Sequence, residues 1–141
     1  MTTDHRVADA ATRLRQARVG RLATVGPDAP HVVPCCFAVE DSVAYSVVDD
    51  KPKRTPQLQR LADVSAHPFA TLLVDHYEED WSALWWIRVS GPARIVVDGP
   101  EHARAVGLLR GKYRQYVDHA LTGPVLALEL RDWRTWAAES N

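Results

Sequence analysis

The chain has 141 residues, a length that predicts one domain over residues 1–141. Its net charge is -1, from 17 basic and 18 acidic residues, so the composition gives no general attraction to nucleic acid or to anionic membranes. There is no signal-peptide pattern and no apolar run of about 18 residues. The two cysteines are adjacent, at Cys35 and Cys36, and form no disulfide framework. We therefore expect a cytoplasmic protein that binds neither nucleic acid nor membrane.

The first half of the chain predicts two helices that enclose three strands. Apolar residues at helical spacing predict a helix over residues 5–17. Thr55 is a suitable N-cap and Pro56 a suitable first residue for a second helix over residues 56–66. Turn residues occupy positions 26–30. Apolar, β-branched runs predict the strands, at residues 21–25, 31–39 and 43–48.

The second half predicts three more strands and a third helix. The helix begins near Pro100 and has an apolar side that extends to Val117. The strands are predicted at residues 69–75, 84–98 and 124–133, with a break or bulge in the long one at Gly91 and Pro92. The order α-β-β-β-α-β-β-α-β, with short turns and few helices, predicts a mainly β fold with flanking helices. We expect a six-stranded antiparallel barrel in place of a parallel sheet.

A group of positive side chains precedes the second helix, in the stretch "DDKPKRTPQL". Lys51, Lys53 and Arg54 lie directly before Thr55 and Pro56. A helix N-terminus presents unpaired N–H groups and a partial positive charge, which together favour an anion such as phosphate. The alternative is an exposed loop whose charges are neutralised by the two preceding aspartates.

Three stretches together resemble a known superfamily. They are "GRLATVGPDAPHVVPCCF", "KPKRTPQLQRLADVSAHPFATLLVD" and "WSALWWIRVSGPARIV". Their order and spacing, over about residues 6 to 137, resemble the flavin-binding split barrels of the pyridoxamine 5'-phosphate oxidase superfamily. The chain is most similar to the small branch that uses the deazaflavin coenzyme F420. The resemblance implies a six-stranded antiparallel split β-barrel.

The resemblance also implies a cofactor site shared by the two subunits of a homodimer. In such families a basic segment before the first inner helix holds the cofactor phosphate, and the matching positions are Lys51, Lys53, Arg54 and Thr55. A strand with an x-Pro-x-x-x-Pro pattern lines the ring, and here it contains Pro30 and Pro34. The C-terminal motif that binds the substrate phosphate in the true oxidase is missing, which argues against pyridoxamine phosphate as substrate.

Trp86 and Arg88 are further candidates for the cofactor site. Trp85 and Trp86 are adjacent on a predicted strand, so one faces the barrel and the other is free for a dimer interface or for stacking on a flat ring. Arg88 shares the face of Trp86, where a charge needs an anionic partner. The alternative partner is a cross-strand carboxylate such as Asp75.

Two other groups of residues carry less functional meaning. The pair Cys35–Cys36 lacks the spacing of a redox or metal motif, so buried small side chains are the better interpretation. The acidic stretch "DHYEED" fits no calcium or zinc motif, and we interpret it as a solvated loop without a metal site.

The function that follows from the resemblance is an F420-dependent reduction of an unsaturated small molecule by hydride transfer. No catalytic triad, carboxylate pair or metal set is visible, so the catalytic residues stay unassigned. His31, Tyr45 and Tyr77 are candidate proton donors. Two alternatives stay open: the same fold with FMN as cofactor, and a non-catalytic carrier of a flavin, haem or tetrapyrrole.

Overall fold

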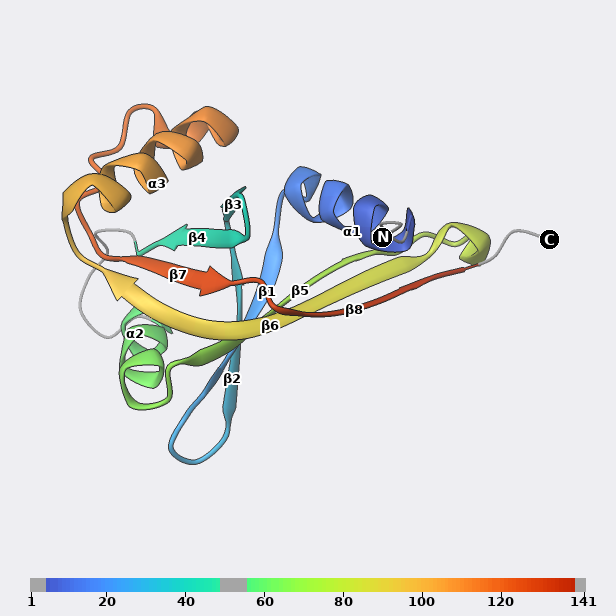
Figure 1. The fold of residues 1–141 in the computed structure, drawn as a ribbon, viewed down its shortest axis with the longest axis horizontal. Helices are drawn as coiled ribbons and strands as arrows, with labels where there is room; N and C mark the ends of the chain where they lie inside the picture. The colour runs from blue at the N-terminus through green and yellow to red at the C-terminus, as the bar shows by residue number, and fades with distance from the viewer. Residues whose placement is uncertain (1–4, 49–55, 139–141) are drawn as a thin grey trace.

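The computed structural model describes residues 5–48 and 56–138. Three helices flank an antiparallel sheet (Figure 1). The helices are α1 (His5–Gln16), α2 (Pro56–Ala66) and α3 (Gly99–Lys112), and short 3-10 turns occupy η1 (Trp81–Ala83) and η2 (Arg114–Tyr116). The strands are β1 (Gly20–Val25), β2 (Pro30–Cys35), β3 (Ala38–Glu40), β4 (Val43–Val47), β5 (Phe69–His76), β6 (Trp85–Val96), β7 (Val125–Glu129) and β8 (Asp132–Ala137). Among the residues described, no helix has the length and apolarity that a membrane span needs.

The sheet is organised around β6, its longest strand. Along the path β2-β1-β5-β6-β7-β4-β3 each strand pairs with the next, and β8 pairs with β6. One edge of β6 pairs with β5, while the other edge pairs first with β8 and then with β7. The mainly β antiparallel architecture with flanking helices is therefore confirmed, as a sheet that curls into a split barrel.

The predicted count of six strands is wrong, because two predicted strands are each divided. The run 31–39 becomes β2 and β3, which are separated at Phe37. The backbone N–H of Phe37 donates to the Tyr113 hydroxyl (3.0 Å), and its carbonyl accepts from Lys112 Nζ (2.8 Å). These side chains from the end of α3 take the backbone groups that a strand ladder would otherwise use, so the strand stops there.

The predicted strand 124–133 is also divided, into β7 and β8, and the division changes how this part of the chain pairs with β6. Ser90 pairs with Asp132 and Ala93 pairs with Leu128, so two residues of β6 lie opposite three residues of the partner chain. The extra residue is therefore in the partner, and β6 itself runs unbroken through the predicted break at Gly91 and Pro92. A Cβ at Gly91 would lie 1.9 Å from the carbonyl oxygen of Glu129, so the crossing requires glycine.

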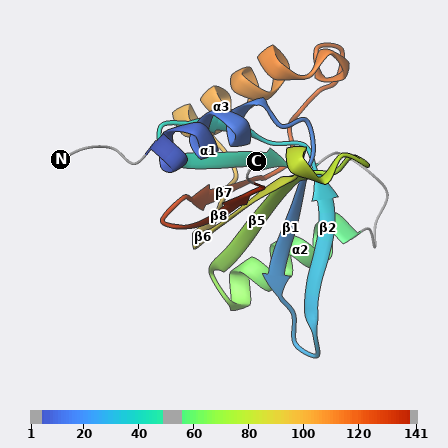
Figure 2. The same ribbon diagram turned by 90° about the vertical axis from the view of Figure 1, so that its right-hand side faces the viewer.

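The barrel interior contains the larger of two apolar clusters. Alternate residues of β1, β5 and β6 point into it, among them the fully buried Leu72, Ile87 and Val89. From α1, Ala10 and Leu14 enter the same cluster one turn apart, as their helical spacing predicts. Figures 1 and 2 show α1 and α3 above the strands β6, β7 and β8, and α2 below them.

The second apolar cluster lies between α3 and the strands β3, β4 and β7. Ala105, Val106 and Leu109 of α3 are buried against Tyr45 and Ala127. The helix ends at Lys112, short of the predicted Val117, because Tyr113 has an extended backbone (φ -117°, ψ 115°). α3 therefore covers one half of the barrel exterior.

Candidate cofactor site

The exterior of the other half of the barrel forms one continuous exposed surface, which we call the outer face. Cross-strand pairs define it: Pro34 lies opposite Arg21, Arg21 opposite Leu73, Leu73 opposite Arg88, and Arg88 opposite Arg134. Side chains directly opposite each other in an antiparallel pair share a face, so this row crosses five strands on one side. No described helix packs on the outer face.

A pocket of about 430 Å³ opens on the outer face near the start of β6. This volume is within the range of sites for small molecules and cofactors, roughly 300–1,000 Å³. Its walls are mostly aromatic and aliphatic, with a few polar groups, and consist of Leu73, Asp75, His76, Tyr77, Leu84, Trp85, Trp86, Arg88 and Trp136. The structure therefore places two of the predicted site residues, Trp86 and Arg88, in one pocket.

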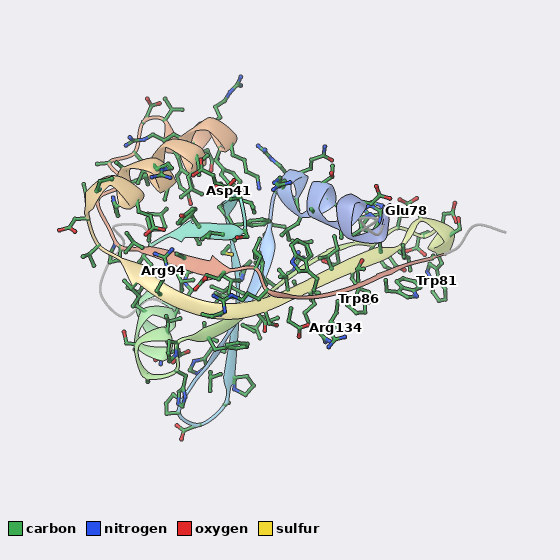
Figure 3. All side chains as sticks on the ribbon, viewed as in Figure 1. Asp41, Glu78, Trp81, Trp86, Arg94 and Arg134 are labelled. Carbon is green, nitrogen blue, oxygen red and sulfur yellow. The ribbon has the colours of Figure 1, made fainter. Side chains whose placement is uncertain are left out.

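The two adjacent tryptophans face opposite sides of β6, as predicted. Trp85 packs against the interior cluster, with the Arg13 guanidinium 5.0 Å from its ring centre and the His76 ring stacked at 6.0 Å. Trp86 is half-buried on the outer face. Figure 3 shows Trp86 on the side of the sheet away from α1, together with Arg134. One ring is thus committed to packing, and the other is available to a ligand or a partner.

Arg88 is exposed, and its guanidinium lies 5.7 Å from the Trp86 ring centre. The predicted alternative, an ion pair between Arg88 and Asp75, is wrong. Asp75 lies opposite Trp86 on β5 and pairs instead with Arg21 of β1, at 3.4 Å. Among the described residues Arg88 therefore has an aromatic neighbour but no carboxylate partner.

Pro34 lies on an edge strand, as its missing N–H predicts, because β2 is the end of the sheet path and pairs only with β1 in the described part of the chain. The side chains of Pro30, Val32 and Pro34 are all exposed on the outer face. Pro34 joins the same row as Arg88, with Arg21 and Leu73 between them. The proline-bearing strand and the Trp86 pocket are thus two ends of one surface.

The predicted phosphate-binding residues Lys51, Lys53, Arg54 and Thr55 lie outside the described residues. The helix that they precede, α2, begins at Pro56 as predicted.

A buried polar network joins α2 to the β1–β2 hairpin. Asp63 is 2% exposed, and its carboxyl accepts hydrogen bonds from Thr24 Oγ1 (2.8 Å) and Gln59 Nε2 (2.9 Å) and contacts His31 Nδ1 (2.6 Å). Burial by itself would raise the pKa of Asp63, but the hydrogen bonds outweigh it and lower that pKa. The network fixes α2 against the hairpin, and sequence reasoning did not identify Asp63.

The three candidate proton donors lie in different places. Tyr45 is buried under α3 and its hydroxyl donates to Glu101 Oε2 (2.8 Å), so burial and this bond raise the pKa of Tyr45. His31 belongs to the Asp63 network. Tyr77 alone lines the Trp86 pocket; it is 62% exposed, and its hydroxyl contacts Glu79 (3.4 Å). Of the three, only Tyr77 is therefore positioned for chemistry in that pocket.

The prediction is confirmed for Cys35 and in part for Cys36 and the acidic stretch, whose first residues Asp75 and His76 end the strand β5. Cys35 is buried, and burial raises the pKa of its thiol to about 11, so it stays protonated at neutral pH. Cys36 is half-buried, and both thiols are free. Residues 75–80 are exposed, and Asp80 caps η1 through the backbone N–H of Ser82.

Among the residues of this surface that sequence reasoning missed are Arg134 and Trp136. Both belong to β8, beyond the predicted end of the last strand at residue 133. The alternation of large side chains in "DWRTWA" was the available signal, because tryptophan and threonine favour strands. Its pairing with β6, which brings Trp136 to the pocket and Arg134 opposite Arg88, is a tertiary feature.

Comparison with known proteins identifies the class. Residues 7–137 match the pyridoxamine 5'-phosphate oxidase family, and the chain belongs to that family. No curated protein matches the chain.

Several solved structures have the same fold at low sequence identity. A conserved hypothetical protein from Mycobacterium tuberculosis is 21% identical, with a TM-score of 0.75 over 97% of this chain and 86% of the other. A FAD-binding protein from Mesorhizobium loti is 19% identical, with a TM-score of 0.69 over 91% of each chain. The haem storage protein HutZ from Vibrio cholerae is 12% identical, with a TM-score of 0.70 over 97% of this chain and 95% of the other. These similarities establish the split-barrel fold.

Proposed function

We propose that the protein is an oxidoreductase that binds the deazaflavin coenzyme F420 on its outer face and reduces an unsaturated small molecule. The observation that carries this proposal is the Trp86 pocket, which combines flat aromatic walls with a cation that has no carboxylate partner among the described residues. A conjugated ring fits beside tryptophan, and the acidic groups of such a cofactor fit arginine. FMN has the same two features, so it is the alternative cofactor.

The chain's own residues would then have distinct tasks. Pro34 leaves the edge of β2 without a donor at one position, so a flat ring can lie beside that backbone. Trp86 orients the ring and excludes water, and Arg88 attracts an anionic group. Lys51, Lys53, Arg54 and Thr55 would hold the phosphate before α2. The bound deazaflavin supplies hydride transfer without one-electron chemistry with oxygen.

We further propose that the outer face is covered by a second copy of the chain. The exposed apolar side chains on it include Val32 (62% exposed), Phe69 (49%) and Trp136 (46%). A patch of this kind on a β exterior is typical of an interface. An obligate homodimer buries about 2,000 Å² or more, and it would enclose the pocket between the subunits. The free thiols Cys35 and Cys36 suit a reducing compartment, so we propose a cytoplasmic location.

The test of the function is a titration of the purified protein with F420 and with FMN, followed by a turnover assay with each reduced cofactor. We expect tighter binding of F420 and reduction of at least one unsaturated substrate. Arg54→Ala should weaken cofactor binding roughly 10- to 100-fold, because a hydrogen bond to a charged group contributes about 1.5–3 kcal/mol. Tight binding of FMN but not of F420 would show that FMN is the cofactor. Binding of neither cofactor would contradict the proposal.

The test of the assembly is sedimentation at low micromolar concentration, where we expect a dimer. Trp86→Ala should weaken both self-association and cofactor binding. Val117→Ala, an exposed substitution after η2, is the control and should change neither. A monomeric wild-type protein that binds cofactor would contradict the shared site.

A haem carrier is the second candidate function, and one observation favours it. His76 lines the Trp86 pocket, and imidazole is a common haem ligand. HutZ, a haem storage protein, has the same fold. The absorption spectrum separates the candidates: a Soret band that His76→Ala removes would support the carrier, and its absence after haem addition would exclude it.

A further inference from the structure

Two cross-strand pairs of identical residues lie side by side on the outer face. Trp86 of β6 is directly opposite Trp136 of β8, and Arg88 is directly opposite Arg134. The pairs are two residues apart along each strand, so all four side chains project from the same side. Neighbouring strands lie about 4.8 Å apart, so the backbone positions of each pair are direct neighbours.

The charges on this surface do not balance. Its charged side chains in the described part of the chain are three arginines and two aspartates: Arg21, Arg88, Arg134, Asp75 and Asp132. Asp75 pairs with Arg21 (3.4 Å) and Asp132 with Arg134 (3.5 Å). Arg88, the remaining cation, lies between Leu73 and Arg134. Like charges directly opposite each other on a sheet are unfavourable, so Arg88 and Arg134 favour an anion between them.

The ion pair between Arg134 and Asp132 is weak. The Arg134 side chain is 62% exposed, that of Asp132 is 61% exposed, and the N–O distance is long. An exposed pair of this kind stabilises a protein by about 0–1 kcal/mol, so a ligand carboxylate can replace Asp132 at little cost. A carboxylate or phosphate that meets the planar guanidinium with two hydrogen bonds makes a stronger interaction.

We propose that Arg134 and Trp136 of β8 bind the substrate, and that this substrate is a planar conjugated molecule bearing a carboxylate or phosphate. The inference rests on the proposed function in that Trp86 and Arg88, the β6 members of the two pairs, are assigned to the cofactor. Trp136 then stacks on the conjugated part, and Arg134 binds the acidic group. Because the paired residues are cross-strand neighbours, the two ligands would be adjacent.

The experiment measures binding of cinnamate, a planar conjugated carboxylate, by calorimetry, with cinnamamide as the neutral analogue and acetate as the anion without a ring. We expect the wild-type protein to prefer cinnamate to both analogues. Arg134→Gln should weaken cinnamate binding about 10-fold or more and leave cinnamamide unchanged, and Arg134→Lys should restore only part of the loss. Arg131→Gln is the matched control, since Arg131 is an exposed arginine of the same chain segment that pairs with Glu129 (2.8 Å) and does not lie opposite Arg88.

The outcomes separate this inference from the proposed function. Arg134→Gln should bind F420 and FMN within about twofold of wild type. If neither cofactor binds to any variant but cinnamate binding still requires Arg134, the anion site stands and the cofactor assignment fails. Equal affinity for cinnamate and cinnamamide, or unchanged cinnamate binding by Arg134→Gln, would overturn the inference. A loss of dimer that matches the loss of cinnamate binding would also overturn it, since Arg134 would then serve the partner subunit.

Discussion

Arg88 and Arg94 both belong to β6, and their side chains project from the same side of the strand. Their surroundings nevertheless differ completely. Arg94 lies on the half of the exterior that α3 covers. Its guanidinium makes two hydrogen bonds to the Glu101 carboxylate, at 2.5 and 2.7 Å, and Tyr45 donates to the same carboxylate at 2.8 Å. Arg88 lies on the uncovered half, where the Trp86 ring is its neighbour among the described residues.

The difference shows how one helix divides the barrel exterior into a half that α3 covers and a half that no described helix covers. α3 brings Glu101 to Arg94, so that charge contributes to the fold and is no longer available to a ligand. The hydrogen bonds from Arg94 and Tyr45 lower the pKa of Glu101 to about 2, which marks a strongly stabilised carboxylate. On the uncovered half no described helix brings a carboxylate to Arg88, and the guanidinium stays available.

The largest effect should come from the residue that joins the two halves. In Gly91→Ala the new Cβ would meet the Glu129 carbonyl oxygen at 1.9 Å, where β6 changes partner from β8 to β7. We expect a loss of about 3 kcal/mol in the free energy of unfolding, measured by urea denaturation. Gly107→Ala is the control: a Cβ there meets nothing within 4 Å, so this helix substitution should stabilise by about 0.5–1 kcal/mol. Equal stability of the two variants would contradict the tight crossing.

The next effect tests the covered half alone. Arg94→Gln removes both charged hydrogen bonds to Glu101 and leaves that carboxylate with Tyr45. The Arg94 side chain is 44% exposed, which reduces the expected loss to about 1.5 kcal/mol in the free energy of unfolding. Urea denaturation at pH 7 measures it, and an unchanged midpoint would show that the pair contributes nothing to the fold.

The ion pair between Arg94 and Glu101 should also make the free energy of unfolding depend on pH. The pKa of Glu101 is about 2 in the folded state, against an ordinary value of 4.5. A lowered pKa means that the stabilisation is complete above about pH 4.5 and is lost as the pH falls from there toward 2. Because the side chain is a third exposed, we expect about 1 kcal/mol from this group. Unfolding measured at pH 6 and pH 3 should show this loss in wild type and a smaller loss in Glu101→Gln, while Asp28→Asn, in the exposed 26–29 turn, should behave as wild type.

The smallest effect belongs to the uncovered half. Arg88→Gln should change the free energy of unfolding by no more than about 0.5 kcal/mol, because an exposed cation without a carboxylate partner among the described residues adds little to the fold. Relief of the repulsion from Arg134 favours a slight gain. Urea denaturation of the ligand-free protein measures it. A loss as large as that of Arg94→Gln would show that the two halves do not differ in the way described.

Local patterns were enough to predict most elements. Helical spacing predicted α1, and Pro56 predicted the start of α2, since these signals depend only on neighbouring residues. The opposite faces of Trp85 and Trp86 followed from the period of a strand. Pro34 lies on an edge strand, which is consistent with local chemistry because a residue without an N–H cannot serve a central ladder.

Other features depended on residues far apart in the chain. The strand over 31–39 stops at Phe37 because Tyr113 and Lys112, about 75 positions later, bind its backbone groups. Asp75 pairs with Arg21 across β1 and β5, although Arg88 is nearer in sequence. Neighbouring residues do not indicate which distant side chain will take a hydrogen-bonding group or a carboxylate.

The sequence by itself therefore determined the element types, the alternation of each strand and the presence of Trp86 and Arg88 on one face. Only the tertiary structure decided which of these faces is covered. Side chains alternate along a strand regardless of what packs on either face. Arg88 and Arg94 therefore occupy equivalent positions on β6. The packing of α3 and the pairing of β8 with β6 then give Arg94 a carboxylate and give Arg88 a second arginine beside an aromatic pocket.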